Sequence, residues 1–186
     1  MKRILPFAAL LLLAALIFSF VVRPDKAAAE TAVESAAADA EFKWYTWDEA
    51  VAASAKSPKK IMVDVYTDWC GWCKRMDKST FSDEGVQAFL KDKFYAVKLD
   101  AEQKEDINFR DYTFKWVDQG RRGVHELAVQ LLQGRMSYPS IVYLNEDFEI
   151  ITTSPGYKDV GGLMKELTFI GDEHYLTTDW QQYSQQ

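Results

Sequence analysis

Apolar residues recur along the chain with two periods, one typical of buried strands and one of amphipathic helices. From residue 41 onward, short apolar runs alternate with segments in which apolar residues return every three or four positions. The pattern predicts strands at 42–45, 61–66, 94–99, 140–144 and 148–153. It predicts helices at 47–56, at 70–77, from 82–84 onward, at 124–132 and at 159–170. The last two strands should form an antiparallel hairpin, and the alternation of strands and helices indicates an α/β protein with a mixed sheet.

The segment 102–122 is the least regular part of this pattern. Its alternating aromatic and polar residues predict a small hairpin around Arg110 and Asp111, and the residues 120–123 predict a loop. The segment is therefore interpreted as an insert. It could form a surface for a partner or cover an edge of the sheet.

The first residues differ in character from the rest. Lys2 and Arg3 precede an apolar stretch at 4–22, which is nearly as long as the ~20 residues that span a bilayer. We interpret 1–29 as a secretory signal peptide or an uncleaved N-terminal anchor, 30–40 as an Ala-rich linker and 41–186 as one domain. Either interpretation places the domain outside the cytoplasm, in the periplasm or an equivalent compartment.

Charge and composition exclude several classes of protein. The 186 residues carry a net charge of −6, which argues against a nucleic-acid partner. With only two Cys and two His, the chain cannot build a disulfide-stapled scaffold or a four-thiolate metal site. A mixed site of both cysteines with His125 and His174 is disfavoured, because the two histidines fall in separate predicted elements; both are expected to be solvated.

The chemistry that the sequence suggests centres on Cys70-Gly71-Trp72-Cys73, which follows a buried strand and opens a helix. A helix N-terminus has free N–H groups and a partial positive charge, so a thiol placed there ionises more readily. Cys70 should attack a disulfide, and Cys73, one turn later, should resolve the mixed disulfide. A purely structural disulfide is disfavoured because so short a loop contributes little stability.

Two further positions support this interpretation. Asp64 lies inside an apolar strand, where burial should raise its pKa and let it exchange a proton with Cys73. Lys98, in the neighbouring predicted strand, could pair with it; a purely structural acid is the alternative. Pro139 stands at the entrance of a strand, and a cis Tyr138–Pro139 bond would leave the Tyr138 backbone free to pair with an extended peptide.

The segment 62–74 resembles the active-site segment of the thioredoxin family. The resemblance covers roughly 47–170. It places the family's buried acid on Asp64, its tryptophan on Trp69 and its two thiols on Cys70 and Cys73. The family's lysine falls on Lys98, its cis-proline on Pro139 and a glycine on Gly156. It implies a thioredoxin-like fold, in which helices flank a central mixed β-sheet, with a small insert before the helix that precedes the cis-proline.

The resemblance also implies thiol–disulfide exchange with no cofactor besides the redox-active cysteine pair, and no metal. The catalytic set is then Cys70, Cys73, Asp64 and Lys98, and the substrate-binding set is Trp69, Gly71, Trp72, Tyr138 and Pro139. Implied partners are disulfide- or dithiol-containing proteins and a membrane thiol donor or acceptor of electrons. The protein is expected to be a monomer.

Two positions near the thiols depart from the family pattern. Trp72 replaces the proline usual between the two thiols, and Tyr138 is bulkier than the usual residue before the cis-proline. A non-enzymatic binding or chaperone-like module on the same fold is the alternative, with Trp69, Trp72 and Tyr138 as its recognition patch. Thiol reactivity distinguishes the two hypotheses.

Overall fold

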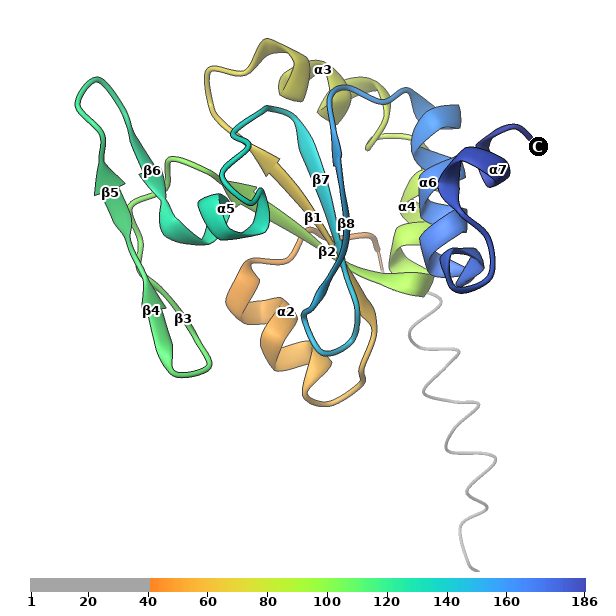
Figure 1. Ribbon diagram of the computed structural model, residues 1–186, viewed down its shortest axis with the longest axis horizontal. Helices are drawn as coiled ribbons and strands as arrows, with labels where there is room; N and C mark the ends of the chain where they lie inside the picture. The colour runs from red at the N-terminus through yellow and green to blue at the C-terminus, as the bar shows by residue number, and fades with distance from the viewer. Residues whose placement is uncertain (1–40) are drawn as a thin grey trace, which may run out of the picture. The chain divides into compact units, whose positions relative to one another are not determined.

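The computed structural model describes residues 41–186 (Figure 1). The predictions of a signal peptide or anchor at 1–29 and of a linker at 30–40 fall outside the described residues. Within 41–186, no helix combines the length and the apolar character needed to cross a membrane.

A four-stranded mixed sheet forms the centre of the fold, in the order β2-β1-β7-β8. Its strands are β1 (Lys60–Tyr66), β2 (Phe94–Asp100), β7 (Ser140–Leu144) and β8 (Ile150–Pro155). β1 runs parallel to β2 and antiparallel to β7, and β7 and β8 form the predicted hairpin. The strand expected at 42–45 is reduced to a single bridge between Tyr45 and Val97.

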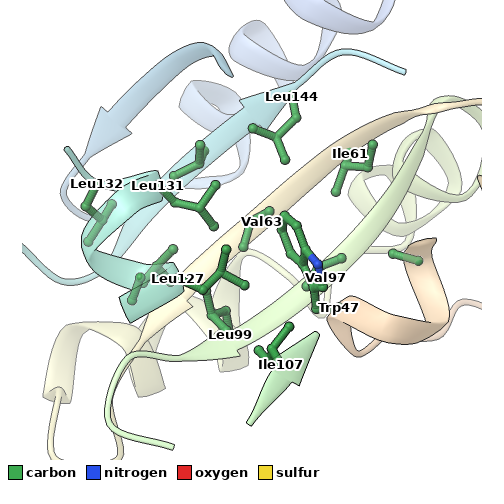
Figure 2. Packing of buried hydrophobic residues seen from close by; sticks show 14 of the residues in the cluster. Trp47, Ile61, Val63, Val97, Leu99, Ile107, Leu127, Leu131, Leu132 and Leu144 are labelled. Carbon is green, nitrogen blue, oxygen red and sulfur yellow. The ribbon is translucent and has the colours of Figure 1, made fainter. Parts of the chain in front are cut away.

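Side chains of β1 point alternately to the two faces of the sheet, and each face has its own core. Ile61, Val63 and Val65 pack against α2 (Trp47–Ser54) and α5 (Glu126–Leu131), as Figure 2 shows in part. Met62 faces the second core, to which three helices contribute: α3 (Gly71–Ser79), α4 (Glu84–Lys93) and α6 (Val160–Gly171). The same alternation directs Asp64 to the second face, beneath the helix that carries the thiols.

Capping residues define where these helices begin. Thr46 and Glu49 form a reciprocal capping box at the start of α2. Asp83 and Asp159 cap α4 and α6, each accepting a hydrogen bond from a backbone N–H of the first turn. A short C-terminal part, η1 (His174–Leu176) and α7 (Trp180–Ser184), packs its rings on Phe169 of α6.

The insert contains two hairpins rather than the single one predicted. β3 (Ile107–Phe109) and β4 (Tyr112–Phe114) turn at Arg110 and Asp111, as expected. The second hairpin, β5 (Trp116–Asp118) with β6 (Gly123–His125), takes two residues from the helix expected at 124–132, so that α5 begins only at Glu126. The Trp116 ring lies directly over Gly123, where even a Cβ atom would lie 1.9 Å from it, and this close packing holds the two strands together.

Candidate functional site

The two thiols lie where β1 leads into α3. Cys70 and Cys73 form a disulfide with a Cα–Cα separation of 5.3 Å. Cys70 caps α3, and its Sγ accepts a hydrogen bond from the backbone N–H of Cys73 at 3.1 Å. In the reduced protein this N–H and the helix dipole would stabilise a Cys70 thiolate. Both residues are buried, with Cys70 5% and Cys73 2% exposed.

Asp64 is buried on β1, the strand that leads into the disulfide, and Lys98 of the adjacent strand forms an ion pair with it. The parallel register of β1 and β2 aligns Asp64 with Lys98, and Lys98 Nζ donates to Asp64 Oδ2 at 2.6 Å. Burial raises the pKa of Asp64 to about 6, although the Lys98 charge opposes the rise. Asp64 Oδ1 accepts no hydrogen bond from any residue of 41–186. The carboxyl group is therefore able to change protonation state near neutral pH.

A third charged residue, which the sequence analysis missed, joins this pair from its more exposed side. Asp77 of α3 also accepts a hydrogen bond from Lys98 Nζ. Burial tends to lower the pKa of Lys98, but Asp64 and Asp77 outweigh it and raise that pKa. The negative charge of Asp77 also adds to the rise of the Asp64 pKa. The one sequence signal is the spacing of Asp77, four positions after Cys73 on the same helix.

Aromatic side chains surround the disulfide on its outer side. Trp69 and Trp72 are 52% and 55% exposed. The Trp69 ring meets the half-buried Tyr138 ring edge-on at 5.9 Å, and the Tyr138–Pro139 peptide bond is cis. Gly71 has open space beside it, since a Cβ atom at this position would have no neighbour from residues 41–186 within 4 Å. The structure thus brings all nine predicted site residues to one end of the sheet.

Each exposed tryptophan also contacts residues that sequence reasoning did not single out. Trp69 Nε1 donates to Glu102 at 3.0 Å, and the Arg122 guanidinium lies 4.3 Å from the Trp69 ring centroid. Glu102 and Arg122 both belong to the insert. On the other side, the ring of Trp72 packs at 5.4 Å against that of Tyr157. The insert therefore reaches the edge of the thiol site.

The histidines contribute nothing to this site. The expectation that His125 is solvated is wrong: it is fully buried, its Nδ1 accepts from Leu127 N–H, and its Nε2 lies 3.1 Å from the Glu105 carbonyl oxygen. Burial lowers the pKa of His125, which favours the neutral ring. His174 is exposed in η1 and stacks on Tyr183. Among residues 41–186, no group of three or more His, Cys, Asp or Glu is placed to hold a metal ion.

Solved structures show which class of fold this is. The chain is similar to a thioredoxin-fold protein from Helicobacter pylori, with 22% identity, a TM-score of 0.53 and coverage of 68% of this chain and 78% of the other. It is similar to a thioredoxin from Thermus thermophilus, with 20% identity, a TM-score of 0.51 and coverage of 70% and 88%. The protein has a thioredoxin-like fold with a disulfide at the position where α3 begins.

The family follows from the sequence match. Residues 28–159 match the family model Thioredox_DsbH, described as "Protein of unknown function, DUF255", and the chain belongs to this family. It is 54% identical over 39 residues to the thiol:disulfide interchange protein DsbD of Pectobacterium atrosepticum, covering 21% of this chain and 7% of that protein. It is 29% identical over 110 residues to the uncharacterized protein B0495.5 of Caenorhabditis elegans, covering 59% and 13%. The chain thus spans a small fraction of the length of these relatives.

Proposed function

We propose that this protein is a thiol–disulfide oxidoreductase that reduces disulfides of exported proteins through Cys70 and Cys73. One observation carries the proposal: a disulfide caps the first turn of α3, and a buried carboxyl group with a pKa of about 6 lies on the strand leading into it. A structural staple would need neither the helix N-terminus nor a costly buried acid. The name of the DsbD relative, a thiol:disulfide interchange protein, supports the same chemistry.

The reaction has two exchange steps. The Cys70 thiolate attacks one sulfur of the substrate disulfide, and a mixed disulfide forms while the other substrate sulfur leaves as a thiolate. The Cys73 thiolate then attacks Cys70 Sγ, which releases the second substrate sulfur and restores the Cys70–Cys73 disulfide. Two electrons pass from the protein to the substrate, and the substrate sulfurs take up two protons.

Asp64 serves as the proton acceptor for Cys73 in the second step. Its pKa of about 6 lies close to the pH at which an exported protein works, as general acid–base catalysis requires. Lys98 tunes this pKa by remaining charged at 2.6 Å from the carboxylate. Both residues therefore act on the proton rather than on the sulfur atoms.

The outer residues hold the substrate. The backbone beside the cis Tyr138–Pro139 bond pairs with an extended substrate segment, and Trp69, Gly71 and Trp72 form the surface on which it lies. The protein acts as a monomer in the periplasm or an equivalent compartment, after export directed by its N-terminal stretch. A membrane thiol protein supplies its electrons.

A redox equilibrium titration of the Cys70–Cys73 pair in the full-length chain tests the proposal. A potential near the thioredoxin value of about −270 mV is expected for a reductant. A value between about −180 and about −120 mV would instead indicate an oxidant or isomerase and would overturn the reductive direction. A Cys70→Ser variant is expected to lose exchange with a disulfide substrate. If that variant still reduces the substrate, the mechanism is wrong.

A further inference from the structure

The side of the disulfide formed by Trp72 carries an arginine that the proposed exchange steps do not use. The Arg75 guanidinium lies 5.2 Å from the Trp72 ring centroid and 5.6 Å from that of Tyr157. These two rings pack against each other at 5.4 Å, and Tyr157 is fixed in turn by a hydroxyl contact with Ser79 at 3.2 Å. Arg75 is therefore held beside Trp72, one of the two residues that separate the thiols in sequence.

The charge of Arg75 is not neutralised within the described part of the chain. No carboxylate of residues 41–186 lies within ion-pair distance of Arg75. The carboxylate of Asp77, two residues later, is engaged by Lys98 on the inner side of α3. Lys74 and Lys78 add two exposed positive charges to the same helix. A basic helix therefore carries the thiols of a chain whose net charge is −6.

The opposite side of the disulfide has the reverse polarity. Tyr138 there lies near Glu102 and Asp100, whose charges add to the effect of burial and raise the pKa of Tyr138 to about 12. Arg122 lies 3.8 Å from Glu102 and offsets the charge of that carboxylate, but not the charge of Asp100. A bound segment with a carboxylate would therefore meet attraction on the Trp72 side and repulsion on the Tyr138 side.

We propose that Arg75 binds a carboxylate of the substrate, so that the site prefers disulfides with Asp or Glu beside the attacked cysteine. The inference rests on the proposed function and adds a substrate class to it. The Arg75 guanidinium interacts with the Tyr157 side chain, whose pKa the Ser79 hydroxyl lowers most and Arg75 helps to lower. A guanidinium has five N–H donors, so donors remain for a bidentate carboxylate. Because the rings already restrict Arg75, less side-chain entropy is lost on binding.

A matched pair of cyclic disulfide peptides tests this, identical except for Glu or Gln beside each cysteine. The full-length chain is reduced with dithiothreitol and desalted, and the second-order rate of peptide reduction is measured. Each rate is divided by the rate with dithiothreitol, which removes the intrinsic effect of Glu on the peptide. We expect the wild type to prefer the Glu peptide by about 5-fold, as for a partly exposed charge pair, and 0.5 M salt to weaken the preference.

Variants then locate the preference. Arg75→Gln should bring the Glu-to-Gln ratio to about 1, and Arg75→Lys should leave an intermediate ratio because the charge remains without the planar fork. Arg110→Gln is the matched control, since Arg110 lies on the insert and donates to the Asp147 carbonyl oxygen. It should keep the wild-type ratio.

The outcomes separate the inference from the function on which it rests. A wild-type ratio of 1 with active protein, or a preference that survives Arg75→Gln, overturns the carboxylate site alone. If neither peptide is reduced, and the oxidised protein does not oxidise their dithiol forms, the proposed function fails and the inference fails with it.

Discussion

The side of the Cys70–Cys73 disulfide that faces the sheet, here the inner side, differs in composition from the side that faces solvent, here the outer side. On the inner side, Asp64 and Lys98 form an ion pair in which the Asp64 side chain is only 2% exposed. On the outer side, Trp69 and Trp72 are more than half exposed. Charge is thus buried and apolar surface is exposed, which reverses the usual arrangement of a globular protein.

This contrast indicates that the two sides control different properties of the site. A buried carboxyl group gains a pKa near neutrality at a cost in stability, so the inner side should control proton transfer and respond to pH. Exposed rings lower the free energy only when a partner covers them, so the outer side should control which substrates react. Substitutions on the two sides should therefore change different observables.

The largest expected effect comes from Asp64→Asn. Burial raises the pKa of Asp64 from 3.8 to about 6, so the folded state binds this proton more tightly and loses stability as pH rises through this interval. A pKa change of this size corresponds to about 3 kcal/mol in the free energy of unfolding. Asp64→Asn should therefore be more stable than the wild type by about this amount at pH 8, and not at pH 4. Urea unfolding at both values measures this. The exchange rate should fall by about 10²-fold, because the proposed proton acceptor is lost.

Asp92→Asn, at an exposed position on α4, is the control for this comparison and should change neither quantity. The prediction is contradicted if Asp64→Asn and the wild type are equally stable at pH 8 and the wild type is no less stable at pH 8 than at pH 4. The buried Asp64 carboxylate would then not destabilise the folded state.

Trp69→Ala sharpens the comparison from the outer side. The indole is held by Glu102 and Tyr138, in a position to contact a docked chain. Its removal should lower the rate with a disulfide-bonded protein by about 10-fold, as for a central interface aromatic, and leave the rate with hydroxyethyl disulfide nearly unchanged. Leu176→Ala removes an apolar side chain of similar exposure far along the chain and should affect neither rate. Equal losses with both substrates would mean that Trp69 acts on the sulfur chemistry itself.

The sequence pattern was sufficient for the four strands of the sheet and for the Asp64–Lys98 pair, but it also predicted a strand at 42–45 where the structure has a single bridge. The apolar run around Asp64 predicts a buried strand. Lys98 occupies the matching position in the next strand, so that parallel pairing of the two strands places it beside Asp64. It failed at His125, because a three-residue strand directly before α5 merges with the helical pattern. The burial of that histidine depends on the Glu105 carbonyl group, twenty positions away, for which the pattern has no signal.

The charged contacts on both sides of the disulfide could not be predicted for a related reason. Arg122 reaches Trp69 only because the second hairpin of the insert folds back toward α3. Asp77 meets Lys98 only because α3 lies on the face of the sheet to which the Lys98 side chain points. The spacing of Asp77 from Cys73 places it on a helix face but does not identify its partner. Such contacts follow from tertiary packing rather than from local pattern.

The smallest expected effect, and the finest test of the inner side, is that of Asp77→Asn. Asp77 raises the Asp64 pKa by its charge and also shares the Lys98 ammonium group. Removing its charge should lower the Asp64 pKa by about half a pH unit, since the Asp77 side chain is 41% exposed and solvent screens it. A titration of the Asp64 carboxyl carbon by NMR measures the change directly. Lys98→Met should move the same pKa upward, because it removes the opposing positive charge; if both variants move it in one direction, the three residues do not form the coupled cluster described above.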